Sequence, residues 1–309
     1  MHQPTPTNKP TPTNKPTLPA GVAVALVTPF TRRGDVDLDA AAYLSQRLHQ
    51  AGVQHFLVAG TTGEAPSLTI EERKELLRAV RQAVPGAFVT VGISGPHEKA
   101  VLDLVDSAAG GADGFLLAPP PYVKPPQWSL RQLCEVVADR SPVPLCLYHI
   151  PGRSAVGFEP ATLEALCQHP RVAALKYADS DLVKLAEIMS RCGSQLTVFS
   201  GEDALYLPML SIGARGIISV AAHVVPRRMI ELTRLQVEGA SQAAARLFLE
   251  LLPALRACFT LTNPIPVKIW LHELGLLPTP ALRSPLSLPP AEATERLLAQ
   301  IRECPHDQL

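Results

Sequence analysis

The sequence predicts an α/β fold, a parallel (β/α)8 barrel followed by a C-terminal helical extension. Eight short apolar runs have the composition of strands that are buried on both faces. Segments with helical periodicity separate the runs, and the alternation fills residues 20–238, which suits a barrel of this kind. The eight runs are Val22–Val27, His55–Val58, Phe88–Val91, Gly114–Leu117, Pro144–Tyr148, Val172–Lys176, Leu196–Phe199 and Gly216–Val220.

Apolar residues recur at helical spacing between these runs, which predicts amphipathic helices on the outside of the barrel. Thr69 and Glu72 form a capping-box pattern before one segment, and Asp181 is a capping residue before another. Local sequence therefore marks where strands give way to helices. The clearest segments are Ile70–Val84, Lys99–Ala109, Leu130–Ala138 and Leu182–Met189.

The chain continues with helical patterns after the eighth run. There are too many of them for the last barrel helix alone, so residues 239–309 are predicted to form an extension packed on the barrel. No flexible linker is visible near Gly239, and we therefore do not expect an independently folding domain. The segments are Pro226–Glu238, Ser241–Leu261, Pro264–Leu274 and Pro290–Arg302.

The N-terminal segment is different in composition. Residues 4–15 repeat Pro-Thr-Pro-Thr-Asn-Lys twice and hold too few apolar side chains to bury, so residues 1–19 are predicted to be disordered. The apolar run Ala20–Val27 is short for a signal peptide and ends in Thr28-Pro29-Phe30 rather than a cleavage site. It fits the first strand better, and no stretch reaches transmembrane length.

Composition excludes several classes of function. Basic and acidic residues balance at 28 each, which argues against binding to nucleic acid or to an anionic membrane. The six cysteines are widely spaced and the nine histidines form no pair at ligand spacing, so no metal site is expected. Free cysteines suit a reducing compartment, and we expect a cytoplasmic protein.

Lys176 ends the sixth apolar run, at a position where a parallel barrel places its chemistry. Burial disfavours the charged form of a lysine, and a neutral amine can attack a carbonyl carbon. The alternative is a side chain that extends from the strand end into solvent, and a lone lysine at a strand end favours this alternative.

The segment Gly60-Thr61-Thr62-Gly63-Glu64 follows the second run. Its backbone N–H groups and hydroxyls are suited to bind a carboxylate, although an ordinary glycine-rich turn would look the same. It lacks the lysine of a phosphate-binding loop, and no Gly-x-Gly-x-x-Gly motif follows any strand. We therefore expect no nucleotide cofactor, and no other cofactor is indicated.

Two further strand ends carry polar groups. Tyr148 could serve as a general acid and base, and Arg153 as a clamp for a carboxylate; a packed tyrosine and a solvated arginine are the alternatives. The proline-rich loop Ala118–Pro126 is stiff and could project Tyr122 into a neighbouring subunit, or could be a structural turn. Lys268 lies in a helical segment and is expected to be structural.

Taken together, these stretches resemble the pyruvate-dependent class I aldolase family that includes dihydrodipicolinate synthase and N-acetylneuraminate lyase. The tandem threonines Thr61 and Thr62 and the arginine at 153 are closest to the dihydrodipicolinate synthase branch. The resemblance covers Gly21 to about Pro290 and rests on six motifs in the same order. They are Ala25–Phe30, Gly60–Glu64, Leu147–Arg153 with Lys176, Ser200–Asp203, Gly216–Val220 and Asn263–Lys268.

The resemblance implies a Schiff-base mechanism without a cofactor. Lys176 would form an imine with the ketone of pyruvate and use its positive charge as an electron sink. Tyr148 would move protons, linked through the hydroxyl of Thr61 to Tyr122 of an adjacent subunit. The family commonly forms tetramers of tight dimers, so a homotetramer is expected.

The resemblance also assigns substrate-binding roles. Thr62 would hold the pyruvate carboxylate, Arg153 the carboxylate of the second substrate, and Gly201 would line the pocket. The carbonyl group of Ile218 would help to orient the lysine.

The implied reaction is condensation of pyruvate with L-aspartate-4-semialdehyde, a step of lysine biosynthesis. An aldolase or dehydratase of 2-oxo-3-deoxy sugar acids or of a hydroxy-2-oxo acid is the alternative within the family. A barrel that only binds oxo acids is the alternative from another class. The combination of a nucleophile with a proton relay argues against this last reading.

The chain departs from the synthase pattern at several positions. Tyr177 stands where synthases generally have an acidic residue, His149 replaces an asparagine, Ser154 a threonine, and Pro121 the first of two tyrosines. The segment Gly92–His97 lacks the asparagine that helps to bind inhibitory lysine in feedback-regulated members. We therefore expect weak or no inhibition by free lysine.

Overall fold

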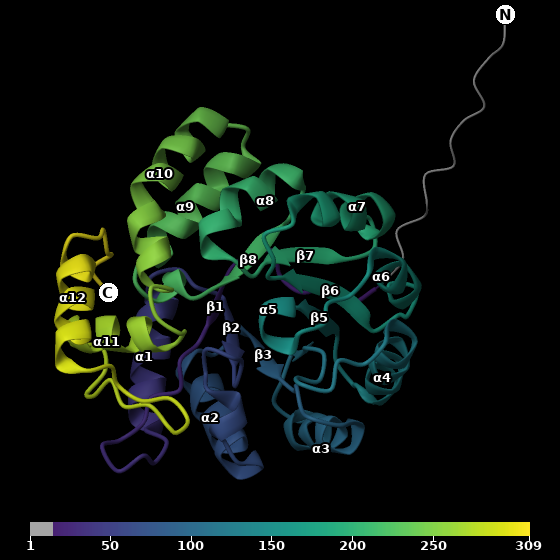
Figure 1. The fold of residues 1–309 in the computed structure, drawn as a ribbon, viewed down its shortest axis with the longest axis horizontal. Coiled ribbons are helices and arrows are strands. Elements are labelled where there is room, and N and C mark those ends of the chain that lie inside the picture. The colour runs from purple at the N-terminus through teal and green to yellow at the C-terminus, as the bar shows by residue number, and fades with distance from the viewer. Residues whose placement is uncertain (1–14) are drawn as a thin grey trace, which may run out of the picture.

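The computed structural model describes residues 15–309, and its centre is a closed parallel barrel of eight strands. Each strand pairs with the next in sequence, and β8 closes on β1, as the central arrows in Figure 1 show. The predicted barrel is therefore confirmed. The strands are β1 Gly21–Ala25, β2 His55–Val58, β3 Phe88–Gly92, β4 Gly114–Leu117, β5 Leu145–His149, β6 Val172–Tyr177, β7 Thr197–Ser200 and β8 Gly216–Ser219.

Helices follow the strands at the predicted positions, with ends that differ by a few residues. The capping box of Thr69 and Glu72 is present, and the Asp181 side chain accepts a hydrogen bond from the Lys184 backbone N–H at 2.8 Å. The helices are α1 Leu38–Gln50, α2 Ile70–Ala83, α3 Glu98–Ala108, α4 Gln127–Arg140, α5 Pro151–Ser154, α6 Pro160–Leu166, α7 Leu182–Cys192, α8 Tyr206–Ile212, α9 Pro226–Val237, α10 Ser241–Ala257, α11 Ile265–Glu273 and α12 Ala291–Arg302, with short 3-10 turns at Ala65–Ser67, Asp203–Leu205 and Ala221–His223.

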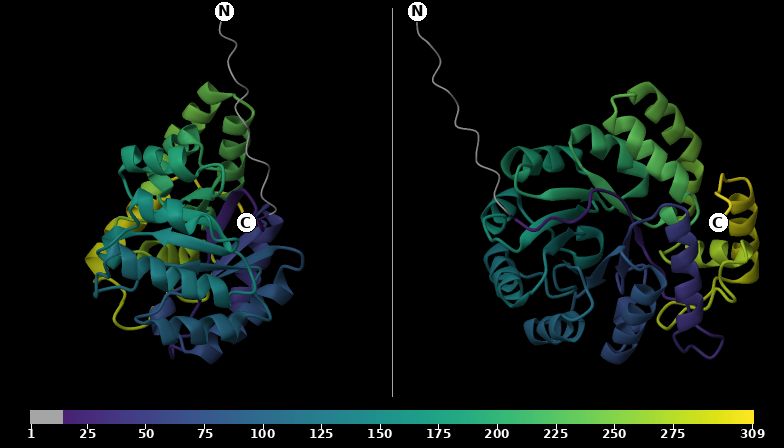
Figure 2. Two further views of the ribbon diagram at one scale, coloured as in Figure 1. Left: turned by 90° about the vertical axis from the view of Figure 1, so that its right-hand side faces the viewer. Right: turned by 180° about the vertical axis from the view of Figure 1, so that it is seen from behind.

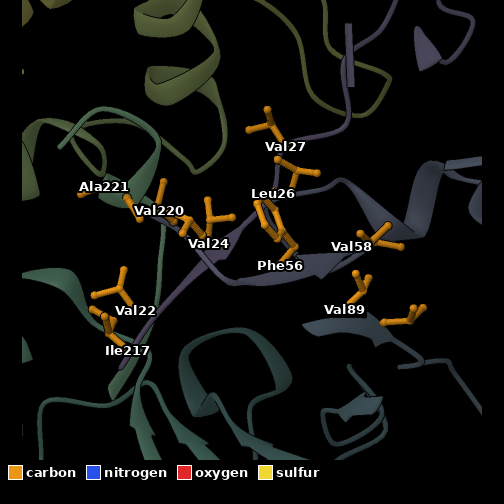
Figure 3. Packing of buried hydrophobic residues seen from close by; sticks show 14 of the residues in the cluster. Val22, Val24, Leu26, Val27, Phe56, Val58, Val89, Ile217, Val220 and Ala221 are labelled. Carbon is orange, nitrogen blue, oxygen red and sulfur yellow. The ribbon is translucent and has the colours of Figure 1, made fainter. Parts of the chain in front are cut away.

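Buried apolar side chains form two layers, because every barrel strand has one face toward the helices and one toward the barrel axis. Figure 3 shows part of the outer layer, where Val24, Phe56, Val89 and Ile217 of four neighbouring strands are buried. The inner layer contains small residues, among them Ala23, Ala25 and Ala174.

The C-terminal extension lies against one side of the barrel. Helix α12 contacts α10 and α11; α11 and α12 lie side by side in Figures 1 and 2, and α10 lies mainly along α9. The predicted boundary between barrel and extension, at residue 239, stays a prediction.

The N-terminal prediction concerns mainly residues that lie outside the described part of the chain. Of the predicted disordered segment 1–19, only residues 15–19 are described. Within these, Leu18 is 2% exposed and packs with the inner layer. Contacts to the barrel therefore begin before the first strand.

Candidate active site

Lys176 and Tyr148 face each other at the C-terminal ends of β6 and β5. They are register partners in the two neighbouring strands, and the Lys176 Nζ lies 4.4 Å from the centre of the Tyr148 ring. Both residues are nearly buried, at 5% and 6% exposure. The Lys176 ammonium makes no hydrogen bond or ion pair with any side chain or carbonyl of residues 15–309. The lysine therefore does not extend into solvent, and its amine is free to react.

Gly201 lies against the lysine at the end of β7. A Cβ atom at this position would lie 3.0 Å from the Lys176 Cε and 2.7 Å from the Ala178 Cβ. Any larger residue would therefore push the lysine from its place. This steric requirement explains a glycine beside the lysine, and its predicted place in the pocket wall remains a prediction.

A cavity of about 700 Å³ opens beside these strand ends and includes three of the predicted site residues, Thr61, Tyr148 and Arg153. Its volume falls in the range of small-molecule sites. Tyr148 lines the cavity and also lies next to the Lys176 Nζ, so its ring stands between the cavity and the amine, which does not itself line the cavity.

The turn Gly60–Glu64 carries the predicted carboxylate site. Thr62 is 3% exposed, and its hydroxyl accepts a hydrogen bond from the Asn263 side-chain amide at 2.9 Å, which leaves the hydroxyl proton free for a substrate oxygen. The Thr28 hydroxyl donates to the Gly63 carbonyl at 2.6 Å. A Cβ at Gly63 would lie 3.1 Å from the Leu26 carbonyl oxygen, so the turn packs directly on the strand end.

Asn263 belongs to the site although the sequence analysis assigned it no role. Its side chain binds the Thr62 hydroxyl, and its carbonyl oxygen accepts a hydrogen bond from Arg153 at 3.2 Å. Its buried Oδ1 has no partner within the described part of the chain. Asn263 thus connects the two predicted carboxylate-binding residues, which are far apart in sequence. The only sequence signal was its place in the motif before Pro264.

Glu202 is a second residue that was not predicted. It follows Gly201, is half-buried, and its carboxylate makes no hydrogen bond or ion pair with residues 15–309. Burial raises the pKa of Glu202, the neighbouring Asp203 raises it further, and the Lys176 charge lowers it. An unpaired acid near the reactive amine is available to bind a cationic group of a substrate.

The two unusual residues beside the site face away from it. Because side chains alternate along a strand, Tyr148 and Lys176 point to the barrel axis while His149 and Tyr177 point to the outer layer. The rings of His149 and Tyr177 stack at 4.7 Å with an interplanar angle of 10°. The Tyr177 hydroxyl donates to the Asp181 carbonyl at 2.7 Å. These two departures from the synthase pattern therefore lie outside the cavity, whereas two others, Pro121 and Ser154, line it.

The hydrogen bonds of His149 fix its tautomer. Its Nδ1 accepts the Phe158 backbone N–H at 3.1 Å, so the proton is on Nε2 and is directed to Asp179 at 3.3 Å. Burial lowers the pKa of His149, against the raising effect of Asp179. A Cβ at Gly157 would lie 2.4 Å from the ring, which explains the glycine there. His149 acts as a neutral packing residue.

Five of the eight predicted residues do not line the cavity, namely Lys176, Thr62, Gly201, Tyr122 and Ile218. Tyr122 is 92% exposed and has a left-handed backbone with φ of 74°. Ile218 lies in the inner layer of β8 at 1% exposure, and no hydrogen bond joins its carbonyl to the Lys176 amine in this structure. The predicted roles of these residues remain predictions.

Residues 15–309 contain no cluster of three or more His, Cys, Asp or Glu side chains arranged to hold a metal ion. In the same part of the chain, no helix is both long and apolar enough to cross a membrane. The six cysteines are buried and form no disulfide.

Comparisons with known proteins identify the family of this chain. Residues 18–303 match the model of the dihydrodipicolinate synthetase family. A 4-hydroxy-tetrahydrodipicolinate synthase of Synechococcus sp. (strain WH7803) is 42% identical over 265 residues, which cover 85% of this chain and 87% of that protein.

Solved structures give the same result. The dihydrodipicolinate synthase of Acinetobacter baumannii, complexed with pyruvate, has a TM-score of 0.88 at 30% identity and covers 92% of this chain and 98% of its own. The enzyme of Cyanidioschyzon merolae with lysine bound has a TM-score of 0.86 at 34% identity and covers 92% and 97%. The chain belongs to the dihydrodipicolinate synthetase family.

Proposed function

We propose that this protein condenses pyruvate with L-aspartate-4-semialdehyde through an imine on Lys176. The observation that carries the proposal is the buried amine of Lys176, which has no hydrogen-bond or ion-pair partner among residues 15–309 and lies 4.4 Å from the centre of the Tyr148 ring, at the C-terminal end of the barrel strands. Such an amine is a nucleophile with a proton-transfer group beside it, and the reaction needs no cofactor.

The first half of the reaction activates pyruvate. The amine of Lys176 adds to the ketone carbon, and loss of water leaves a cationic imine. The cation withdraws electrons from the methyl carbon, which gives up a proton and becomes the nucleophilic carbon of an enamine. Tyr148 is placed to take and return the protons, and Thr61 lines the same cavity. Thr62 holds the pyruvate carboxylate with its free hydroxyl proton.

The second half joins the aldehyde. The enamine carbon attacks the aldehyde carbon, and the amino group of the product can then replace Lys176 at the imine carbon, closing a six-membered ring and freeing the enzyme. Arg153 binds the carboxylate of the aldehyde substrate. Glu202 binds its ammonium group, because its half-buried carboxylate has no partner among residues 15–309.

The surroundings of the reaction are part of the proposal. The exposed ring of Tyr122 reaches the site of a second subunit, within a homotetramer. The buried cysteines, which form no disulfide, support a reducing cytoplasmic compartment.

Free lysine inhibits the enzyme weakly or not at all. Pro96 lines the cavity but offers no side-chain hydrogen bond, and the Ser94 hydroxyl already accepts the Ala118 N–H at 2.8 Å. Inhibition of the purified enzyme by a low concentration of lysine would contradict this.

Turnover measured with a panel of acceptors tests the proposed substrates. Purified enzyme with pyruvate is given aspartate semialdehyde, and cleavage of several 2-oxo-3-deoxy sugar acids is assayed in parallel. We expect a far higher kcat/KM with aspartate semialdehyde. Activity confined to the sugar acids would favour the alternative reaction within the family, and binding of pyruvate without turnover of any substrate would favour an oxo-acid-binding protein.

A further inference from the structure

The C-terminal extension reaches back to the carboxylate-binding turn through one buried residue, Glu64. Glu64 ends the turn and is 4% exposed. One oxygen of its carboxylate accepts a hydrogen bond from Lys268 Nζ at 2.5 Å, and the other accepts the Arg283 backbone N–H at 3.0 Å. Both donors belong to the extension, about 200 residues further along the chain.

The Lys268 side chain is held on every side. It is fully buried, donates a second hydrogen bond to the Ala281 carbonyl at 2.8 Å, and lies 4.2 Å from the centre of the Phe30 ring. The guanidinium of Arg283 lies 4.6 Å from the same ring. Phe30, which follows the first strand, therefore packs with two cations of the extension. Glu64 is bound to a rigid group rather than to a mobile surface lysine.

Further contacts of the extension hold the same segment on both sides of Glu64. Arg283 makes two hydrogen bonds to the Glu72 carboxylate at 2.9 and 2.5 Å and one to the Ser67 carbonyl at 2.9 Å. Asn263 binds the Thr62 hydroxyl directly. The segment from Thr62 to Glu72 is thus fastened to the extension at four residues.

The backbone of the turn needs such support. Glu64 has a φ of 52°, a left-handed conformation that costs free energy for a residue with a Cβ. Within the turn, Glu64 donates to the Thr61 carbonyl at 3.0 Å, and Ala65 donates to the Gly60 carbonyl at 3.2 Å. The carboxylate of Glu64 adds the anchor that fixes this conformation from outside the turn.

We propose that Glu64, Lys268 and Asn263 are positioning residues for the first substrate, which hold Thr61 and Thr62 where its carboxylate binds. The inference rests on the proposed function, since it takes this turn as the pyruvate site. The extension is then a working part of the active site and not only a covering of the barrel.

A paired substitution tests the inference without leaving an unpaired charge. In Glu64→Gln/Lys268→Met both charges are removed together, because removal of one partner alone strands the other in the protein interior. We expect the half-saturating concentration of pyruvate, measured by borohydride trapping on Lys176, to rise at least about tenfold, about 1.4 kcal/mol. At saturating pyruvate, the KM for the aldehyde should stay within about twofold of wild type, because Arg153 is bound through the backbone carbonyl of Asn263 and not through Glu64 or Lys268.

Two further variants separate positioning from general loosening. Leu297→Ala removes buried contacts of α12, where Leu297 is 4% exposed and far in sequence from the turn; it should lower stability and leave pyruvate half-saturation unchanged. Asn263→Ala removes the bond to Thr62 with both charges kept, and should weaken pyruvate binding even if the paired variant fails to fold.

Three results would overturn the inference: unchanged pyruvate half-saturation in the folded paired variant, unchanged half-saturation in Asn263→Ala, or an equal rise in Leu297→Ala. Wild-type enzyme that takes up no pyruvate would overturn the proposed function and this inference with it. Uptake by wild type together with any of the three results would overturn the inference alone.

Discussion

Two lysines of residues 15–309 are buried, and their surroundings differ. Lys176 ends a barrel strand, is 5% exposed, and has no hydrogen bond or ion pair within the described residues. Lys268 lies in the C-terminal extension, is fully buried, and is bound by Glu64 and by the Ala281 carbonyl. One amine is available for chemistry, and the other is committed to structure.

The comparison teaches that a shifted pKa alone does not identify the nucleophile. Burial lowers the pKa of Lys268 to about 8, although Glu64 raises it, and such a value is often taken to mark a reactive lysine. Yet this amine is locked between a carboxylate, a carbonyl and an aromatic ring. Lys176 has instead a phenol at its side and a residue without side chain, Gly201, to make room for it.

Removal of the reactive amine should have the largest effect on activity. Lys176→Ala can form no imine, so we expect kcat/KM to fall at least about 10³-fold. Lys184→Ala, on the neighbouring helix α7, removes a partly exposed lysine and should keep nearly full activity. An active Lys176→Ala variant together with a folded but inactive Lys268→Met variant would contradict the roles assigned to the two buried lysines.

Stability should respond in the opposite way. Lys268→Met leaves the buried Glu64 carboxylate without its ion-pair partner, and we expect a loss of about 3 kcal/mol in the free energy of unfolding. Lys176→Met removes a buried cation that has no partner and should leave stability unchanged or higher. Urea unfolding of both variants beside wild type measures this, and equal losses would show that the two environments do not differ.

A glutamate lies near each lysine. Glu64 is paired with Lys268, whereas Glu202, near Lys176, has no partner among residues 15–309. Glu202→Gln should raise the KM for aspartate semialdehyde about tenfold, because the ammonium of this substrate loses its counter-charge. Succinate semialdehyde lacks that ammonium and serves as the matched control when it is used as a competitive inhibitor, with an expected change in its inhibition constant below about twofold. Equal effects on both aldehydes would show that Glu202 does not bind the amine.

The smallest expected effect concerns the ion pair between Glu72 and Arg283, whose guanidinium lies against the same Phe30 ring as Lys268. The hydrogen bonds from Arg283 hold the pKa of Glu72 down at about 2. Since this lies below the pKa of an unfolded glutamate, about 4.3, the contribution to stability is present above that pH and is lost as the pH falls toward about 2. For a partly exposed pair we expect no more than about 1 kcal/mol.

Thermal unfolding of Glu72→Gln and wild type at neutral and acid pH checks this sign. The variant should unfold at lower temperature near neutrality, and the difference should shrink in acid. A difference that grows in acid would mean that Glu72 is not stabilised as a carboxylate by Arg283.

The barrel and its catalytic end could be predicted because the signal is local. Apolar runs alternate with helical periods, and capping residues such as Thr69 mark the boundaries. The position of Lys176 at a strand end followed from that alternation. The sequence could not show that Tyr177 faces outward. The run is apolar on both faces, so its pattern does not indicate which of Lys176 and Tyr177 points to the barrel axis.

The partners of the turn could not be predicted, because they are distant in sequence. Glu64 binds Lys268, and Thr62 binds Asn263, in each case a residue about 200 positions away in the sequence. The residues next to each partner contain no pattern that predicts either pair. Glu202 differs again: it was visible beside Gly201, but only the fold shows that its carboxylate has no partner in residues 15–309.

Borohydride trapping with pyruvate, followed by mass mapping of the peptides that bear Lys176 and Lys268, tests the central claim most directly. The account predicts a reduced pyruvate adduct on Lys176 and none on Lys268. Absence of an adduct on Lys176, or its appearance on Lys268, would contradict it.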